Sequence, residues 1–274
     1  MTSEEMTGED LEPRPSEADP RPGLLDEPPW DELRRDLTLL LVRPPVADWV
    51  DDRIAALDPA FWLIIEAADA RTLAEPWLSP LMRDGLRRVR DGDRELTVLT
   101  TEGCASLLEA TTRRAFEARW TLRHAEVMHD PRGRHEGIAS AAGRLEVDAL
   151  ERAARTLYLG AYAALDALPH AGDQTLVVAG EAAGAVARLA CLLDEGCYPP
   201  PEWLYPAARA TQRSRWLRPW LDGLTGDEDT QRRAAQAAPD VLRELASGLR
   251  AQFSNRPWLQ DPERFALRAP RGRG

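Results

Sequence analysis

Residues 176–206 read LVVAGEAAGAVARLACLLDEGCYPPPEWLYP. Small and apolar residues dominate the first twenty positions, and Gly196 follows them at the place where helices commonly end in a left-handed turn. The prolines at 199–201 break any continuing helix. We therefore predict a helix over 176–195, a turn at Gly196, and a second half of the chain built from helices.

Gly180 and Gly184 lie one helical turn apart in this stretch and are surrounded by alanines. Because glycine lets another backbone approach closely, the pair predicts tight packing against a neighbouring helix of a bundle. Glu181, Arg188 and Asp194 interrupt the apolar run, which argues against a membrane span.

The sequence on both sides of this stretch also has helical periodicity. Between residues 147 and 168, apolar side chains recur at alternating spacings of three and four, which places them on one helical face. Further helices are expected over 202–224 and 227–253, with a break or kink at Pro239. An all-α helical bundle over residues 141–255 follows from these patterns.

The first half of the chain mixes strand and helix signals. Residues 61–67 (FWLIIEA) have the composition of a buried strand, and residues 95–101 (ELTVLTT) alternate like one. The run 36–43 suits a strand or a helix end equally well. The remaining expected elements are helices over 49–57, 78–89 and 104–123 and a brief extended segment over 125–128. The predicted fold class is α+β, with a small mixed α/β domain over 30–140 preceding the bundle.

Charge is distributed unevenly along the chain, whose formal net charge is -11. Residues 1–29 are acidic and proline-rich, and we expect a disordered acidic tail there. Residues 256–274 end in arginines, and we expect a basic C-terminal tail.

Composition excludes several kinds of chemistry. All 35 basic residues are arginine, so Schiff-base lysines and the Walker-type phosphate loop are both excluded. The 3 cysteines form no CxxC pair and indicate neither a disulfide framework nor a structural zinc site. With no signal peptide and no run of about 20 apolar residues, we expect a cytoplasmic protein.

Two segments carry a family resemblance: TLRHAEVMHDPRGRHEG over 121–137 and LACLLDEGCYPPPEWL over 189–204. The first resembles the last strand and turn of the catalytic domain in nucleotidyltransferase-fold proteins. The second resembles the helical C-terminal domain of the branch that includes kanamycin nucleotidyltransferase and the DUF4037 proteins. The resemblance implies a nucleotidyltransferase-like domain over 30–140 and, in an active member, a nucleoside triphosphate and Mg²⁺.

The catalytic motif of that family is incomplete in this chain. It requires a Gly-Ser turn followed by two carboxylates at i and i+2 on one strand face, where they grip metal ions. No glycine occurs between Gly23 and Gly85. The remaining metal candidates are Asp91, Asp93 and Glu95, of which the resemblance carries over only Glu95. The same three residues also suit a polar hairpin turn.

Substrate-binding candidates lie in the helical half. In aminoglycoside-type relatives, acids of this domain face a cationic substrate. The resemblance implies that role for Glu181, Asp194, Glu195 and Glu202, and Trp203 is a further substrate-binding candidate. Solvent exposure is the simpler explanation for these carboxylates. The family pattern also expects a basic residue before Trp203, where this chain has Glu202.

Two further groups of residues allow other interpretations. His124, His129 and His135 lie close to Asp130 and include possible metal ligands, but their spacing suits a loop better. The tryptophans 203, 216, 220 and 258 are mixed with the arginines 209, 213, 215 and 218. This mixture suits either nucleic-acid stacking or a core beside a solvated arginine face.

Three functional hypotheses remain open at this point. The first is a catalytically degenerate nucleotidyltransferase-like protein, a pseudoenzyme that binds an unidentified protein partner or small-molecule ligand in the interdomain cleft. The second is an active metal-dependent nucleotidyltransferase that uses Asp93 and Glu95 to hold Mg²⁺. The third is a nucleic-acid-binding protein that uses the arginines and tryptophans.

Overall fold

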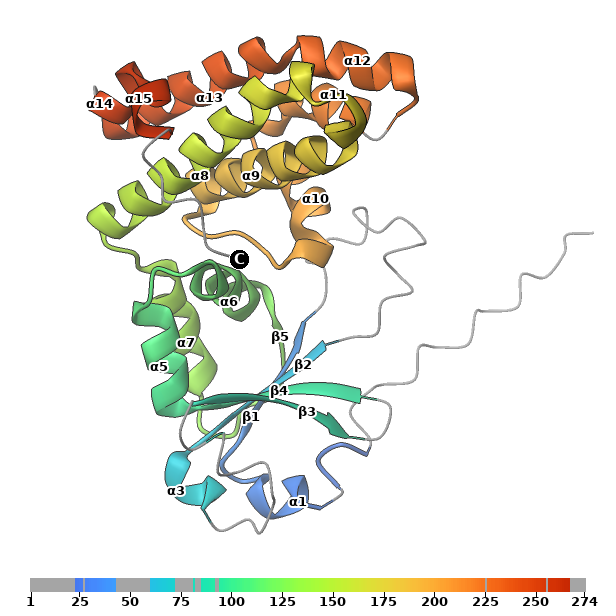
Figure 1. Ribbon diagram of the computed structural model, residues 1–274. Coiled ribbons are helices and arrows are strands. Elements are labelled where there is room, and N and C mark those ends of the chain that lie inside the picture. The colour runs from blue at the N-terminus through green and yellow to red at the C-terminus, as the bar shows by residue number, and fades with distance from the viewer. Residues whose placement is uncertain are drawn as a thin grey trace, which may run out of the picture.

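The computed structural model describes residues 23–26, 28–42, 60–71, 81, 85–91, 94–224, 226–254 and 256–266. A five-stranded mixed sheet occupies the first half, and helices occupy the second half (Figure 1). The predicted α+β class is therefore confirmed.

The strand order in the sheet is β3-β4-β2-β1-β5. Neighbours run antiparallel except β2 and β4, which are parallel. The strands are β1 (Thr38–Val42), β2 (Ala60–Ile65), β3 (Leu86–Asp91), β4 (Arg94–Thr100) and β5 (Glu126–His129). The run 36–43, which suited a strand or a helix end equally, contains the strand β1.

Strand alternation gives the sheet two apolar faces. Leu39, Leu63 and Val98 pack on one face with α1 (Trp30–Leu33). Leu40 and Leu99 pack on the other face with residues of three helices, α5 (Thr101–Glu109), α6 (Arg113–His124) and α7 (Arg134–Gly143). The short helix α3 (Ala67–Ala70) follows β2.

The chain around Gly85 differs from the helix predicted over 78–89. Residues 86–91 form strand β3, and the predicted helix over 49–57 lies outside the described residues. Gly85 has φ 68°, and its carbonyl accepts a hydrogen bond from the amide of Thr100. A Cβ on Gly103 would lie 2.0 Å from the carbonyl oxygen of Gly85. This close backbone contact lets the chain turn at Gly85 and enter the sheet as strand β3.

The single helix predicted over 104–123 is two helices, α5 (Thr101–Glu109) and α6 (Arg113–His124). Thr100 and Thr112 cap their N-termini by accepting hydrogen bonds from the amides of Gly103 and Ala115. A further helix, α7 (Arg134–Gly143), was not predicted.

In the described part of the helical half, α8 and α9 form an antiparallel pair joined by the turns Leu168–His170 and Gly172–Gln174. Gly196 ends α9 with φ 74°, as predicted. The helices are α8 (Val147–Ala167), α9 (Thr175–Glu195), α10 (Pro201–Ala210), α11 (Ser214–Leu224), α12 (Glu228–Gln236) and α13 (Ala238–Phe253).

Residues 256–266, which the sequence suggested were part of a basic tail, are folded onto the bundle. They form α14 (Pro257–Gln260) and α15 (Pro262–Ala266). Trp258 is 3% exposed in the bundle core, and Arg256 pairs with Glu151 of α8 at 2.7 Å. The apolar residues of this segment therefore outweigh its basic character.

Helix α6 lies between the sheet and the bundle (Figure 1). Phe116 and Trp120 belong to the bundle core, whereas Leu122 belongs to the core against the sheet. Arg123 donates a hydrogen bond of 2.6 Å to the carbonyl of Glu195 at the end of α9. Helix α6 thus contributes to both cores and contacts the end of α9.

The glycines of α9 lie on an outward face, which corrects the prediction of close helix packing. A Cβ on Gly180 would meet nothing within 4 Å, and one on Gly184 would meet only the side chain of Arg188. Ala182, Val186 and Leu189 take the inward positions instead. Among the described residues, 172–195 is the one helical segment with the length and composition of a membrane span, and 50% of its apolar window is buried in the fold.

Candidate ligand-binding site

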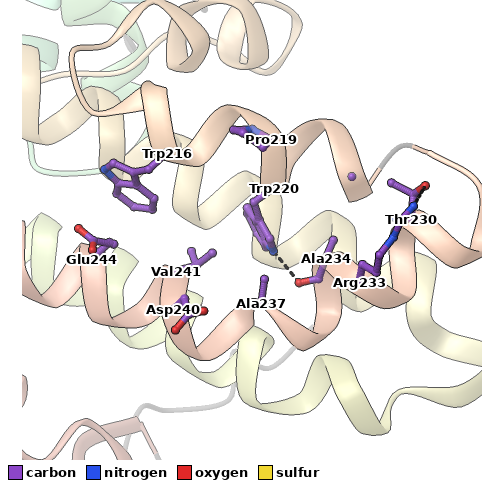
Figure 2. Close-up of a pocket in the computed structure, with 11 residues that line it drawn as sticks. Trp216, Pro219, Trp220, Thr230, Arg233, Ala234, Ala237, Asp240, Val241 and Glu244 are labelled. Carbon is purple, nitrogen blue, oxygen red and sulfur yellow. Dashed lines mark hydrogen bonds between the residues drawn. The ribbon is translucent and has the colours of Figure 1, made fainter.

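A pocket of about 400 Å³ lies between α11, α12 and α13 (Figure 2). Its wall is mostly apolar, with charged side chains at the rim. The lining residues of α11 are Trp216, Pro219, Trp220 and Gly223. Those of α12 and α13 are Thr230, Arg233, Ala234, Asp240, Val241 and Glu244, with Ala237 at the junction of the two helices.

Two tryptophans one turn apart place α11 against its neighbours. Trp220 is 5% exposed, and its indole N–H donates to the carbonyl of Ala234 at 3.0 Å (Figure 2). Trp216 is only partly buried. A Cβ on Gly223 would lie 3.1 Å from the Cβ of Ala234, so glycine here allows α11 and α12 to approach closely. Trp220 is therefore held in place in the pocket wall, whereas Trp216 remains accessible to solvent.

The rim carries charges that differ in their pairing. Asp240 pairs with Arg243 at 2.6 Å, and Arg233 donates a hydrogen bond to the hydroxyl of Thr230. Glu244, one turn after Asp240, forms no hydrogen bond or ion pair within the described part of the chain. Its carboxylate is exposed and available to a ligand.

A second hollow of about 260 Å³ continues along α13. It shares Trp216 and Glu244 with the first pocket, so these two residues form the boundary between the hollows. Arg213 lines the second hollow and pairs with Asp194 at 3.1 Å. A Cβ on Gly248 would lie 2.6 Å from Nη1 of Arg213, so glycine leaves room for the guanidinium.

The metal candidates lie at the hairpin between β3 and β4. Asp91 is the last residue of β3. In the backbone register of the two strands, Asp91 lies opposite Arg94 and Glu95 lies opposite Arg90. Asp93 lies outside the described residues. In the described ranges, no group of three His, Cys, Asp or Glu side chains has the geometry to hold a metal ion. The metal-site prediction for these residues stays a prediction.

The predicted substrate residues do not line the α11–α13 pocket. Glu181 is exposed in the first half of α9, and Glu202 is exposed at the start of α10. Most of the length of α9 separates them, roughly 20 Å at 1.5 Å per residue. Trp203 is 7% exposed and belongs to the bundle core.

The three histidines have separate partners. His124 lies 2.8 Å from a carboxylate oxygen of Glu195, His129 contacts the carbonyl of Arg34, and His135 contacts the carbonyl of Leu122. Their side chains are thus engaged in structural contacts at three different places.

Asp130 organises the turn between β5 and α7. It accepts hydrogen bonds from the backbone amides of Arg134 and His135 and from the hydroxyl of Thr38. Burial raises the pKa of this carboxyl, but the hydrogen bonds outweigh burial and hold the pKa below its ordinary value. Its role is to hold the turn.

The residues considered for nucleic-acid binding are mostly engaged elsewhere. Three of the tryptophans are buried, Trp203, Trp220 and Trp258. The arginines pair with aspartates, Arg209 and Arg218 with Asp222 and Arg213 with Asp194. The side chain of Arg215 lies outside the described residues. Those three indole rings supply no stacking surface.

The cysteines are all buried and free. Burial raises the pKa of Cys104 and Cys197 to about 11 and raises that of Cys191 further. Thiols with raised pKa values are poor nucleophiles at neutral pH.

The sequence indicates that Trp216 and Trp220 lie one helical turn apart, but it did not lead to a prediction of the pocket that they line. The acidic pair Asp240 and Glu244, at i and i+4 on an amphipathic helix, was the signal that could have added α13. The contribution of Arg233 and Thr230 depends on how α12 packs, which no local pattern specifies.

No protein-family model matches the chain, and no curated protein matches its sequence. Solved structures similar to it include a nucleotidyltransferase-like protein from Exiguobacterium sibiricum 255-15, at 11% sequence identity and a TM-score of 0.39. The match covers 79% of this chain and 71% of that chain. The similarity is therefore distant.

Proposed function

We propose that this chain is a cytoplasmic binding protein whose helical half holds a small, largely apolar ligand between α11, α12 and α13. The observation that carries the proposal is the pocket of about 400 Å³ walled by Trp216 and Trp220. Small-molecule sites are typically 300–1,000 Å³, mostly apolar, with a few polar groups that orient the ligand. The wall and rim residues supply both features.

We further propose that the sheet domain is a degenerate nucleotidyltransferase-like domain, within the broad family that the sequence resembles. The absence of glycine between Gly23 and Gly85 supports this proposal, because the family's phosphate-binding Gly-Ser turn has no counterpart there. Binding takes place in the helical half, away from the junction at α6 where the sequence suggested a cleft.

The test of ligand binding is calorimetric titration with a neutral aromatic probe, 3-phenyl-1-propanol. We expect saturable binding to the full chain. Val241→Phe and, separately, Ala237→Leu should weaken binding at least fivefold, because each fills the pocket. The control is Val147→Phe, since Val147 is 68% exposed and lies on α8. Absence of binding, or equal weakening in the control, would overturn the proposal.

The enzyme alternative is tested with nucleotides. We expect no magnesium-dependent binding of ATP or GTP at millimolar concentrations. Binding that is lost in an Asp93→Ala, Glu95→Ala double variant would instead support an active nucleotidyltransferase and refute the degenerate assignment.

The nucleic-acid alternative is tested by retention on immobilised single-stranded DNA. Binding through arginines would strengthen steeply as the salt concentration falls. We expect no retention even at low salt, since Arg209, Arg213 and Arg218 are already paired with aspartates.

A further inference from the structure

The charges around the α11–α13 pocket are largely neutralised by neighbours. Four charged residues line the two hollows: Arg213, Arg233, Asp240 and Glu244. Arg213 is neutralised by Asp194, which also accepts a hydrogen bond from the amide of Gln212 at 2.7 Å. Asp240 is neutralised by Arg243.

The two remaining charges lie at opposite ends of the pocket. Glu244 is at the same end as Trp216, and Arg233 is at the other end beside Thr230 (Figure 2). Arg233 donates to the hydroxyl of Thr230, whereas Glu244 has no partner among the described residues. The Trp216 end is therefore the more negative end.

An accessible indole beside a free carboxylate is suited to a cation. The face of a tryptophan ring attracts organic cations, and desolvation increases the attraction. A carboxylate adds Coulombic attraction, which is weak in open solvent but grows as a ligand displaces water. Trp216 and Glu244 border both hollows, so a group placed between them meets both residues whichever hollow holds the rest of the ligand.

We propose that the ligand is a small organic cation with an apolar body, whose charged group lies between Trp216 and Glu244. This inference rests on the proposed function, because it names the class of ligand for the same pocket. The apolar body extends along Trp220 and Val241 toward Arg233. Arg233 disfavours a second positive charge there, so the geometry selects a monocation with its charge at one end.

The experiment compares three probes that share a phenylpropyl body. They are (3-phenylpropyl)trimethylammonium, neutral 3-phenyl-1-propanol and anionic 3-phenylpropionate, each titrated into the full chain by calorimetry. We expect the cation to bind about tenfold more tightly than the alcohol and the anion more weakly than the alcohol. Added salt should reduce the preference for the cation.

Glu244→Gln should weaken cation binding about fivefold and leave alcohol binding unchanged. Trp216→Leu should also reduce the preference for the cation. Glu136→Gln is the matched control, since Glu136 is an exposed glutamate of α7 that lines neither hollow. Circular dichroism verifies that each variant is folded.

The outcomes separate the two proposals. If no probe binds, the binding function itself is refuted. If the alcohol and the cation bind equally, or if Glu244→Gln and Glu136→Gln behave alike, the pocket stands but the cation inference is refuted. Tighter binding of the anion would likewise refute it and assign selectivity to Arg233.

Discussion

Helix α6 and the first turns of helix α9 differ in composition and in burial in opposite directions. Five of the residues of α6, RRAFEARWTLRH, are arginine or histidine, yet its segment from Ala118 to Leu122 is fully buried. Helix α9 is the more apolar of the two, yet Leu176 and Val177 near its start are 72% and 65% exposed. Composition alone would have assigned their surroundings the other way round.

The difference has its origin in hydrogen-bonding demand. The last carbonyls of a helix lack intrahelical donors, and buried helix ends need partners from elsewhere. Arg119 of α6 donates to the carbonyls of Ala142 and Arg144 at the end of α7 and of Leu108 near the end of α5. Arg119 is therefore a buried structural donor, whereas the first turns of α9 carry apolar side chains that face solvent.

The largest expected effect is on Arg119, which is 4% exposed. Arg119→Met keeps much of the side-chain volume but leaves the carbonyls of α5 and α7 without donors. Each buried unsatisfied group costs about 1–3 kcal/mol, so we expect unfolding free energy to fall by roughly 3 kcal/mol or more. Urea denaturation monitored by circular dichroism measures the change.

The matched control for this substitution is Arg114→Met, because Arg114 is exposed on the same helix. It should change stability by less than about 0.5 kcal/mol. Equal losses in the two variants would show that arginine content, and not the donation to helix ends, stabilises α6.

A smaller effect is expected at Arg123, which joins the two helices. Its guanidinium donates to the carbonyl of Glu195 at 2.6 Å and to the sulfur of Cys197 at 3.5 Å. Arg123→Met should cost about 1.5–3 kcal/mol, the range for hydrogen bonds to charged groups. Arg152→Met on the exposed face of α8 is the control. An unchanged urea midpoint for Arg123→Met would refute the proposed link between α6 and the end of α9.

Asp130 lies in the turn that follows α6 and β5. We expect its charge-assisted hydrogen bonds to contribute about 1 kcal/mol to the unfolding free energy, in a pH-dependent way. Because its pKa is held below the ordinary value, its contribution is present above pH 4 or so and is lost as pH falls through the folded pKa. Asp130→Asn should therefore lower the unfolding free energy at pH 7 and have less effect near pH 3. An effect independent of pH would exclude the charge as its source.

Local sequence patterns were sufficient where one apolar face determined the element. The strands at 61–65 and 95–100 and the helices α8 and α9 followed from alternation, helical spacing and Gly196. Local sequence patterns were insufficient where a contact between residues distant in sequence determined the structure. Strand β3 (LRRVRD) has no apolar pattern of its own and depends on Gly85 meeting Gly103 and on pairing with β4.

The candidate site was less predictable than the fold for the same reason. Trp216 and Trp220 are recognisable as a pair on one helix face. Only the packing of α11 against α12 buries Trp220 and leaves Trp216 accessible, and only α13 places Glu244 beside it. Arg213 is neutralised by a tertiary pairing with Asp194, whereas Asp240 is neutralised by Arg243 one turn along the same helix.

The smallest expected effect, and the one with the opposite sign, is on α9. Gly180→Ala places a methyl group in open space and removes backbone freedom from the unfolded chain, so stability should rise by about 0.5–1 kcal/mol. Gly196→Ala is the contrast, because φ 74° at the end of α9 disfavours any Cβ and should cost about 1 kcal/mol. Thermal unfolding of both variants tests whether Gly180 only adds backbone freedom on an open face and whether Gly196 is required for a positive φ. A loss of stability in Gly180→Ala would mean that a packed surface covers this face, as its sequence first suggested, and the contrast between α6 and α9 would then disappear.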